Sequence, residues 1–151
     1  MSFLHPLILG VFATLFALVL ELVFSLLPGA FTPLRSTLDG NMPALAFFAL
    51  AEELAKALFL RRLLQTLVTH KAGKASIVIA FAFGFIATEA LIAIGTRGTL
   101  PPQAMAGIAV LHAITIFGYA YTIHRTKKLI PMAIAIAIAT MAHFLYNLFL
   151  A

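Results

Sequence analysis

Apolar residues run along this chain in five long stretches, separated by short breaks that contain charges, proline or glycine. Each stretch has about 20 residues, the length that an α-helix needs to cross a hydrocarbon core of ~30 Å. Pro28 and Gly29 follow the first stretch, and Lys127 and Lys128 precede the last. The pattern therefore predicts five membrane-spanning helices, at about 4–27, 42–64, 75–95, 103–124 and 129–150.

The composition agrees with this membrane assignment. The chain has 151 residues, of which 63% are hydrophobic and only 10% are charged, and its mean hydropathy is +1.09. These values exclude an ordinary soluble domain, so we expect one all-α helical membrane domain over 1–151. The first stretch is too long for the core of a signal peptide and is expected to be retained. The chain has no cysteine, which excludes disulfides, thiolate nucleophiles and cysteine-bound metals.

The positive net charge of +5 is distributed unevenly between the two ends of the predicted helices. Seven basic residues flank the second and fourth connections, and two lie on the opposite side. Basic residues favour the cytoplasmic side of a membrane, so the N-terminus is expected inside and the C-terminus outside. This pattern favours a lipid bilayer over nucleic acid as the partner, and the short chain favours the plasma membrane of a prokaryote. The two sets are Arg61, Arg62, Lys71, Lys74, Arg125, Lys127 and Lys128 against Arg35 and Arg97.

Four consecutive stretches carry ionisable or amide side chains at interior positions. A charged side chain near the centre of a bilayer costs about 2.5–3.5 kcal/mol. Such groups are therefore expected to face one another inside the bundle, where they satisfy each other. They are Glu52, Glu53 and Lys56 in the second stretch, Glu89 in the third, His112 in the fourth, and His143 and Asn147 in the fifth.

Helical spacing places several of these groups on shared faces. Glu52 and Glu53 precede Lys56 by four and three residues, so both carboxylates can reach its ammonium. His143 and Asn147 are four residues apart and share a face. With alternating helix directions, all the groups lie about 9–15 Å from the outer helix ends, which predicts one cluster at a common depth.

The residue types in this cluster point to acid–base chemistry. Carboxylates this close will not all ionise, so at least one is expected to hold a proton. We expect Glu52 to be a general base that activates water, with Glu53 as the close alternative, because Glu52 shares a face with Lys56. Glu89 would share the proton, and Lys56 would orient the carboxylates. The natural reaction of such a set is attack of water on a carbonyl, which is amide hydrolysis.

The histidines and the asparagine complete the expected site. His112 would assist proton transfer or contact the substrate. His143 and Asn147 have the spacing to donate hydrogen bonds to one oxyanion. For every group in the cluster, a structural role that only holds the helices together is the alternative.

These motifs resemble the glutamic intramembrane proteases of the PrsW type, which are related to the CAAX-processing membrane proteases. Glu52-Glu53-Leu54-Ala55-Lys56 matches the first motif, Phe85-Ile86-Ala87-Thr88-Glu89 the second, and His112 and His143-Phe144-Leu145-Tyr146-Asn147 the later ones. The resemblance covers roughly 42–150 and implies that Glu52 or Glu53 activates water and that His143 and Asn147 stabilise the oxyanion. It also implies a membrane-anchored peptide or protein as substrate and no cofactor. Because the family is usually longer, a homodimer that completes the substrate groove is a further expected partner.

Two other functions use the same residues. A small proton-coupled exporter would exchange protons for a cation at Glu52 or Glu89, but it leaves Lys56 and the His143–Asn147 pair without a role. A metal-dependent membrane hydrolase would use the glutamates and histidines as ligands. The chain has no His-Glu-x-x-His motif, and Lys56 would repel a cation, so we expect no metal.

Overall fold

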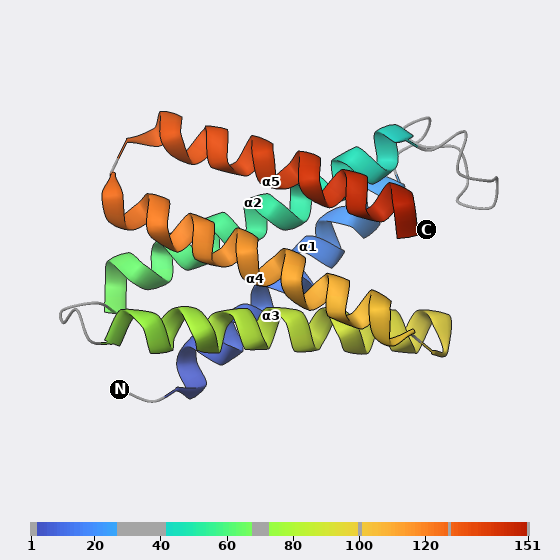
Figure 1. Cartoon of the computed structure of the whole chain (residues 1–151), viewed down its shortest axis with the longest axis horizontal. Helices are drawn as coiled ribbons and strands as arrows, with labels where there is room; N and C mark the ends of the chain where they lie inside the picture. Colours follow the sequence, from blue (N-terminus) through green and yellow to red (C-terminus); the bar gives the residue numbers. More distant parts are fainter. Residues whose placement is uncertain (1–2, 27–41, 68–72, 100, 127, 151) are drawn as a thin grey trace.

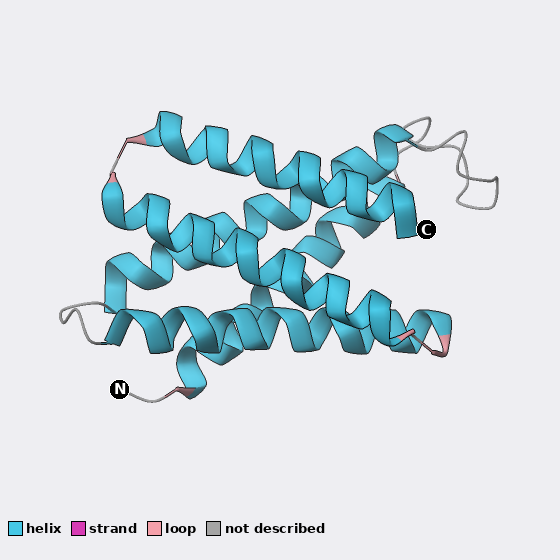
Figure 2. Ribbon diagram, viewed as in Figure 1, coloured by secondary structure: helices cyan, strands magenta, loops and turns pink. Residues whose placement is uncertain are grey.

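The described part of the chain folds entirely into helices. The computed structural model describes residues 3–26, 42–67, 73–99, 101–126 and 128–150, and these contain no strand (Figures 1 and 2). The predicted all-α bundle is thereby confirmed. The helices are α1 (Leu4–Ser25), α2 (Met42–Leu67), α3 (Lys74–Arg97), α4 (Pro102–Arg125) and α5 (Leu129–Leu150).

The helix ends follow local backbone chemistry. Gly98 ends α3 with a φ of 80°, in the left-handed region that glycine adopts without strain. Pro102 begins α4 at a position where its missing N–H has no intrahelical partner to lose. α2 and α3 each extend two or three residues beyond the hydropathy-based range at their ends, because helices continue into the polar region flanking an apolar stretch.

Four of the described helices, α1, α3, α4 and α5, are long and apolar enough to cross a membrane, which identifies a membrane protein. α2 has 26 residues and is also long enough, but its apolar part carries Glu52, Glu53 and Lys56. A helix with these charges needs protein around it, because lipid cannot solvate them.

α2 is the central helix of the bundle. Its backbone lies close to each of the other four, whereas among the described residues the backbones of α3 and α5 do not approach each other, and that of α1 approaches neither α4 nor α5 (Figure 1). Successive helices run in opposite directions, so that α1 begins and α5 ends at opposite ends of the bundle (Figure 1). The most polar helix is thus shielded by the four apolar ones.

α1 and α3 approach each other closely at two glycines. A Cβ on Gly10 would collide with the backbone of Phe81 and Phe85, and a Cβ on Gly84 would collide with the backbone of Leu7. Beside this crossing, the Thr14 hydroxyl donates to the Phe85 carbonyl at 3.2 Å. Small residues permit this kind of backbone contact between membrane helices. The crossing fixes the position of α3, and with it Phe85.

Gly84→Ala should destabilise the bundle, because the added methyl group meets the backbone of α1, which cannot rotate away. We expect a loss of about 1–3 kcal/mol in the free energy of unfolding, measured by SDS titration in mixed micelles. Gly95→Ala on the same helix is the matched control, since a Cβ there meets nothing within 4 Å. The control should be neutral or stabilising by up to about 1 kcal/mol, as alanine is the better helix former. Equal effects of the two substitutions would contradict the proposed crossing.

Candidate functional site

A cluster of polar side chains occupies the interior of the bundle around the middle of α2. It contains six of the seven residues predicted from the sequence and draws them from four helices. They are Glu52, Glu53 and Lys56 from α2, Glu89 from α3, His112 from α4 and His143 from α5. The convergence expected from the insertion cost of charged groups is therefore present in the structure.

Glu53 lies at the centre of the cluster and is fully buried. Its Oε1 accepts hydrogen bonds from the Lys56 ammonium and from His143 Nδ1, the latter at 3.0 Å. Its Oε2 accepts a hydrogen bond from the Tyr119 hydroxyl at 2.7 Å. Three donors from three helices hold this buried carboxylate in place, which favours a positioning role for Glu53 over activation of water.

Lys56 is likewise fully buried and bridges α2 to α3 and α4. Its Nζ pairs with Glu53, lies 2.6 Å from His112 Nδ1, and sits 4.9 Å from the centre of the Phe85 ring. The sequence allowed pairing with Glu52 as well, but the ammonium contacts Glu53 at the i,i+3 spacing instead. The sequence analysis preferred Glu52 as the base because it shares a helix face with Lys56. In the structure that shared face does not lead to an ion pair between the two residues. Glu52 remains the better candidate for the base, because the Glu53 carboxylate already accepts three hydrogen bonds.

The Lys56 contact determines the protonation of His112. An ammonium has only donors, so it can only donate to His112 Nδ1. In the neutral ring the proton must then lie on Nε2, the atom that is paired with Glu89 Oε2. The Phe85 ring packs beside the imidazole, with 5.2 Å between the ring centres. His112 thus presents an N–H to the carboxylate of α3.

His143 has the opposite arrangement. Its Nδ1 faces the Glu53 carboxylate, which can only accept, so Nδ1 carries the proton of the neutral ring. In that neutral ring Nε2 carries no proton, and it lies 3.7 Å from Glu52 Oε2. The His112 and His143 rings lie edge to face with centres 5.1 Å apart. Two adjacent imidazoles thus present one donor and one acceptor to the same space.

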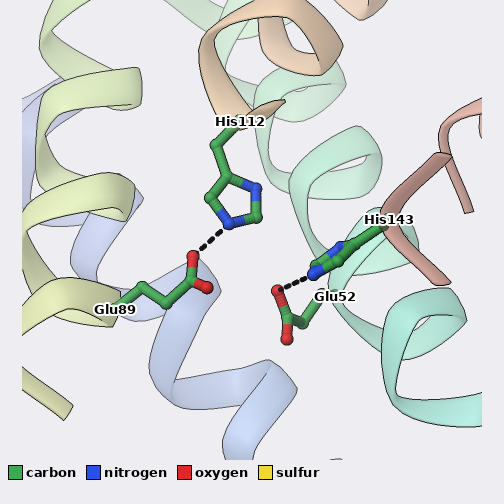
Figure 3. A group of neighbouring side chains, drawn as sticks. All are labelled: Glu52, Glu89, His112 and His143. Atoms are coloured by element: carbon green, nitrogen blue, oxygen red, sulfur yellow. Dashed lines mark ion pairs between the residues drawn. The ribbon is translucent and has the colours of Figure 1, made fainter. Parts of the chain in front are cut away.

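Glu52 and Glu89 form the open side of the cluster. Their side chains are 17% and 21% exposed, whereas Glu53 and Lys56 are not exposed at all. Figure 3 shows both imidazoles directed at these carboxylates, His112 at Glu89 and His143 at Glu52. The exposed part of each side chain lies away from the histidines, because the Oε2 atoms that face the two imidazoles are themselves buried.

Glu21 on α1 joins the open side, although sequence reasoning gave it no partner. Its carboxyl group interacts electrostatically with those of Glu52 and Glu89. Two carboxyl groups can share a hydrogen bond only if one of them holds a proton. The sequence analysis expected Glu52 to share a proton with Glu89. In the structure one carboxylate oxygen each of Glu52 and Glu89 lie within 4.8 Å of each other, Glu89 also pairs with His112, and Glu21 adds a third carboxyl group to this side.

Tyr119 is a second residue that the sequence analysis missed. It lies two helical turns after His112, seven residues along α4, and is buried with 1% exposure. That spacing, which puts a hydroxyl-bearing side chain on the same helix face as His112, is the signal that could have identified it. Asn147 is the predicted residue that stays apart. It is half-buried, one turn after His143, and its side chain makes no hydrogen bond within the described residues.

The cluster also has the composition of a metal centre. One ligand atom each from Glu52, Glu89, His112 and His143 lies within 4.8 Å of the others. His143 fits, because a ligating histidine usually donates its other N–H to a carboxylate, as Nδ1 does here to Glu53. His112 does not fit while Lys56 donates to its Nδ1, because its Nε2 then carries a proton. The cluster therefore offers three metal ligands, from Glu52, Glu89 and His143, close to the buried Lys56 ammonium.

Comparisons with protein-family models, with curated proteins and with solved structures give no match for this chain.

Tyr119→Phe should destabilise the protein, because it removes one donor from the buried Glu53 carboxylate while keeping the ring. A hydrogen bond to a charged group contributes about 1.5–3 kcal/mol, and we expect a decrease of that size in the free energy of unfolding. Tyr121→Phe is the matched control: Tyr121 is 61% exposed on the same helix, and its contact with Arg125 is made by the ring. A Tyr119→Phe protein as stable as the control would show that Glu53 does not need this donor.

Proposed function

We propose that this chain is an intramembrane endopeptidase of the PrsW-like glutamic type, in the plasma membrane of a prokaryote. The observation that carries the proposal is the difference in burial and in partners between the carboxylates. Glu53 and Lys56 are buried and fully engaged, whereas Glu52 and Glu89 stay partly open and each faces an imidazole. A hydrolase that uses no covalent intermediate needs this combination of a fixed interior and an accessible base.

The reaction begins with a water molecule beside Glu52. The Glu52 carboxylate takes a proton from this water while the water oxygen attacks the carbonyl carbon of the scissile peptide bond. The bare Nε2 of His143, 3.7 Å from Glu52 Oε2, is the nearest base to which that proton can pass. The tetrahedral intermediate then breaks its C–N bond as the leaving nitrogen receives a proton, which releases one carboxylic acid and one amine. Atoms and charges balance with water as the sole co-reactant.

The other residues act on this step from fixed positions. His112 directs its Nε2–H toward the space shared with Glu89, where it can donate a hydrogen bond to the substrate. The leaving nitrogen takes the proton that His143 Nε2 received from Glu52. Asn147 and protonated His143 are the proposed donors to the oxyanion. Lys56 holds Glu53 and His112 in place and is a positioning residue. The substrate is a membrane-anchored peptide, because only a chain within the bilayer reaches a site surrounded by apolar helices.

Glu52→Gln should abolish cleavage while leaving the fold intact, since the amide cannot accept a proton from water. We expect a decrease in rate of at least about 10²-fold, the lower end of what a general base contributes. The assay incubates purified protein in liposomes with a panel of single-span peptides and identifies the products by mass spectrometry.

Glu53→Gln is the paired variant, because it makes the same chemical change on the adjacent residue. It leaves the buried Lys56 ammonium without its counter-charge, which should cost about 3–5 kcal/mol of stability and impair folding. Glu52→Gln protein should keep the circular dichroism spectrum and the unfolding midpoint of the wild type. Cleavage at an unchanged rate by folded Glu52→Gln protein would exclude Glu52 as the base.

A second candidate is a metal-dependent hydrolase, favoured by the four ligand atoms within 4.8 Å of one another. The proton on His112 Nε2 argues against it, and we expect cleavage to persist after dialysis against EDTA. Elemental analysis of the same samples checks the expectation. Stoichiometric zinc or iron, together with loss of cleavage on chelation and recovery on adding the metal back, would favour the metal centre. The exporter alternative gives no role to the Lys56–His112 contact.

A further inference from the structure

A cavity lies at the end of the bundle where α2 ends, α3 begins, α4 ends and α5 begins. It has a volume of about 940 Å³ and is lined by residues of all four helices. Ligand pockets in proteins have volumes of about 300–1,000 Å³, so it is large enough to hold a sizeable group. His124 on its wall lies twelve residues after His112, about 18 Å further along α4. The cavity is therefore separate from the carboxylate–histidine cluster.

The charged residues among the described lining of this cavity are all basic. Arg61, Lys74 and Lys128 contribute three permanent positive charges, and His124 lies beside them. No acidic residue is among the lining residues, and the acidic residues of the described helices belong to the other cluster. Arg125 adds a further cation at the rim, where its guanidinium lies 5.4 Å from the centre of the cavity-lining Tyr121 ring. Positive charge without a counter-charge in a cavity attracts an anion.

Most of the remaining lining is apolar. Val78 and Met132 line the cavity and are buried, and Phe117 of α4 lines it and is 46% exposed. A soluble anion would occupy only the basic part and leave these apolar walls against water. A molecule that joins an anionic group to a hydrocarbon chain would cover both parts.

We infer that this cavity binds an anionic phospholipid, with its phosphate held by Arg61, Lys74 and Lys128 and an acyl chain along Phe117 and Val78. The position suits such a ligand, because helix ends lie at the level of the lipid headgroups, and long basic side chains extend toward that level. The expected N-in orientation puts this end of the bundle in the leaflet facing the cytoplasm, which is rich in anionic lipids. The inference does not depend on the proposed peptidase activity.

Native mass spectrometry of the purified full chain tests this site. Dioleoyl phosphatidylglycerol should remain bound in preference to dioleoyl phosphatidylcholine. Arg61→Gln should weaken the binding of phosphatidylglycerol about fivefold, the expected effect of one basic residue at a membrane surface. Arg62→Gln is the matched control: it removes the same charge from the adjacent residue, which is exposed and does not line the cavity. Its affinity should stay within about twofold of the wild type.

The acyl-chain part has its own comparison. Phe117→Ala should weaken the binding of phosphatidylglycerol, whereas Phe83→Ala, an exposed phenylalanine of α3 outside the cavity, should not. Equal losses for Arg61→Gln and Arg62→Gln would mean that only the general surface charge attracts the lipid, and would overturn the site. Displacement of the lipid by millimolar glycerol 3-phosphate would identify a site for soluble phosphates instead. Equal retention of the two phospholipids would also overturn the inference.

Discussion

The buried ion pair of Glu53 and Lys56 is the constraint on which the polar interior depends. A buried ion pair stabilises a protein only when further hydrogen bonds replace the water that both charges lose. Here those bonds come from other helices, from Tyr119 and His143 to the carboxylate and from the ammonium to His112. The pair therefore links α2 to α4 and α5 and at the same time orients both imidazoles. Removing either member would leave the other charge in an apolar interior.

This constraint also explains why the most polar helix is central. α2 carries the pair, and only contact with all four apolar helices keeps its charges away from lipid. The close crossing of α1 and α3 at Gly10 and Gly84 brings Phe85 to the cluster, where its ring lies against the Lys56 ammonium and the His112 imidazole. Packing at a distance from the charges thus determines the position of an aromatic side chain that shields them. The apolar exterior and the polar interior are two parts of one arrangement.

The helices could be predicted from the sequence because a helix that crosses a lipid bilayer needs about 20 consecutive, mostly apolar residues. The last helix was predicted at 129–150, and α5 has those bounds. The convergence of the charged side chains could also be predicted, because exposing any one of them to lipid costs too much free energy. Their pairing was not, because helix geometry allows Lys56 to reach a carboxylate at either i,i−3 or i,i−4, and donors from α4 and α5, Tyr119 and His143, decide the choice. Glu21 was missed because its neighbours belong to other helices, and the spacing within α1 cannot show them.

The positions of the ring protons in the cluster distinguish between reactions that the interatomic distances alone leave equally possible. Glu52, Glu89, His112 and His143 are close enough for a metal centre, for a shared proton or for hydrolysis by an activated water. The two histidines differ in the position of the ring proton. Lys56 can only donate to Nδ1 of His112, so the proton of that ring lies on Nε2, whereas the Glu53 carboxylate can only accept from Nδ1 of His143, so that ring has its proton on Nδ1. One imidazole then offers an N–H and its neighbour a lone pair. Hydrolysis by an activated water can use both, a lone pair that takes up a proton and a fixed N–H that donates a hydrogen bond, whereas a metal requires lone pairs from both histidines.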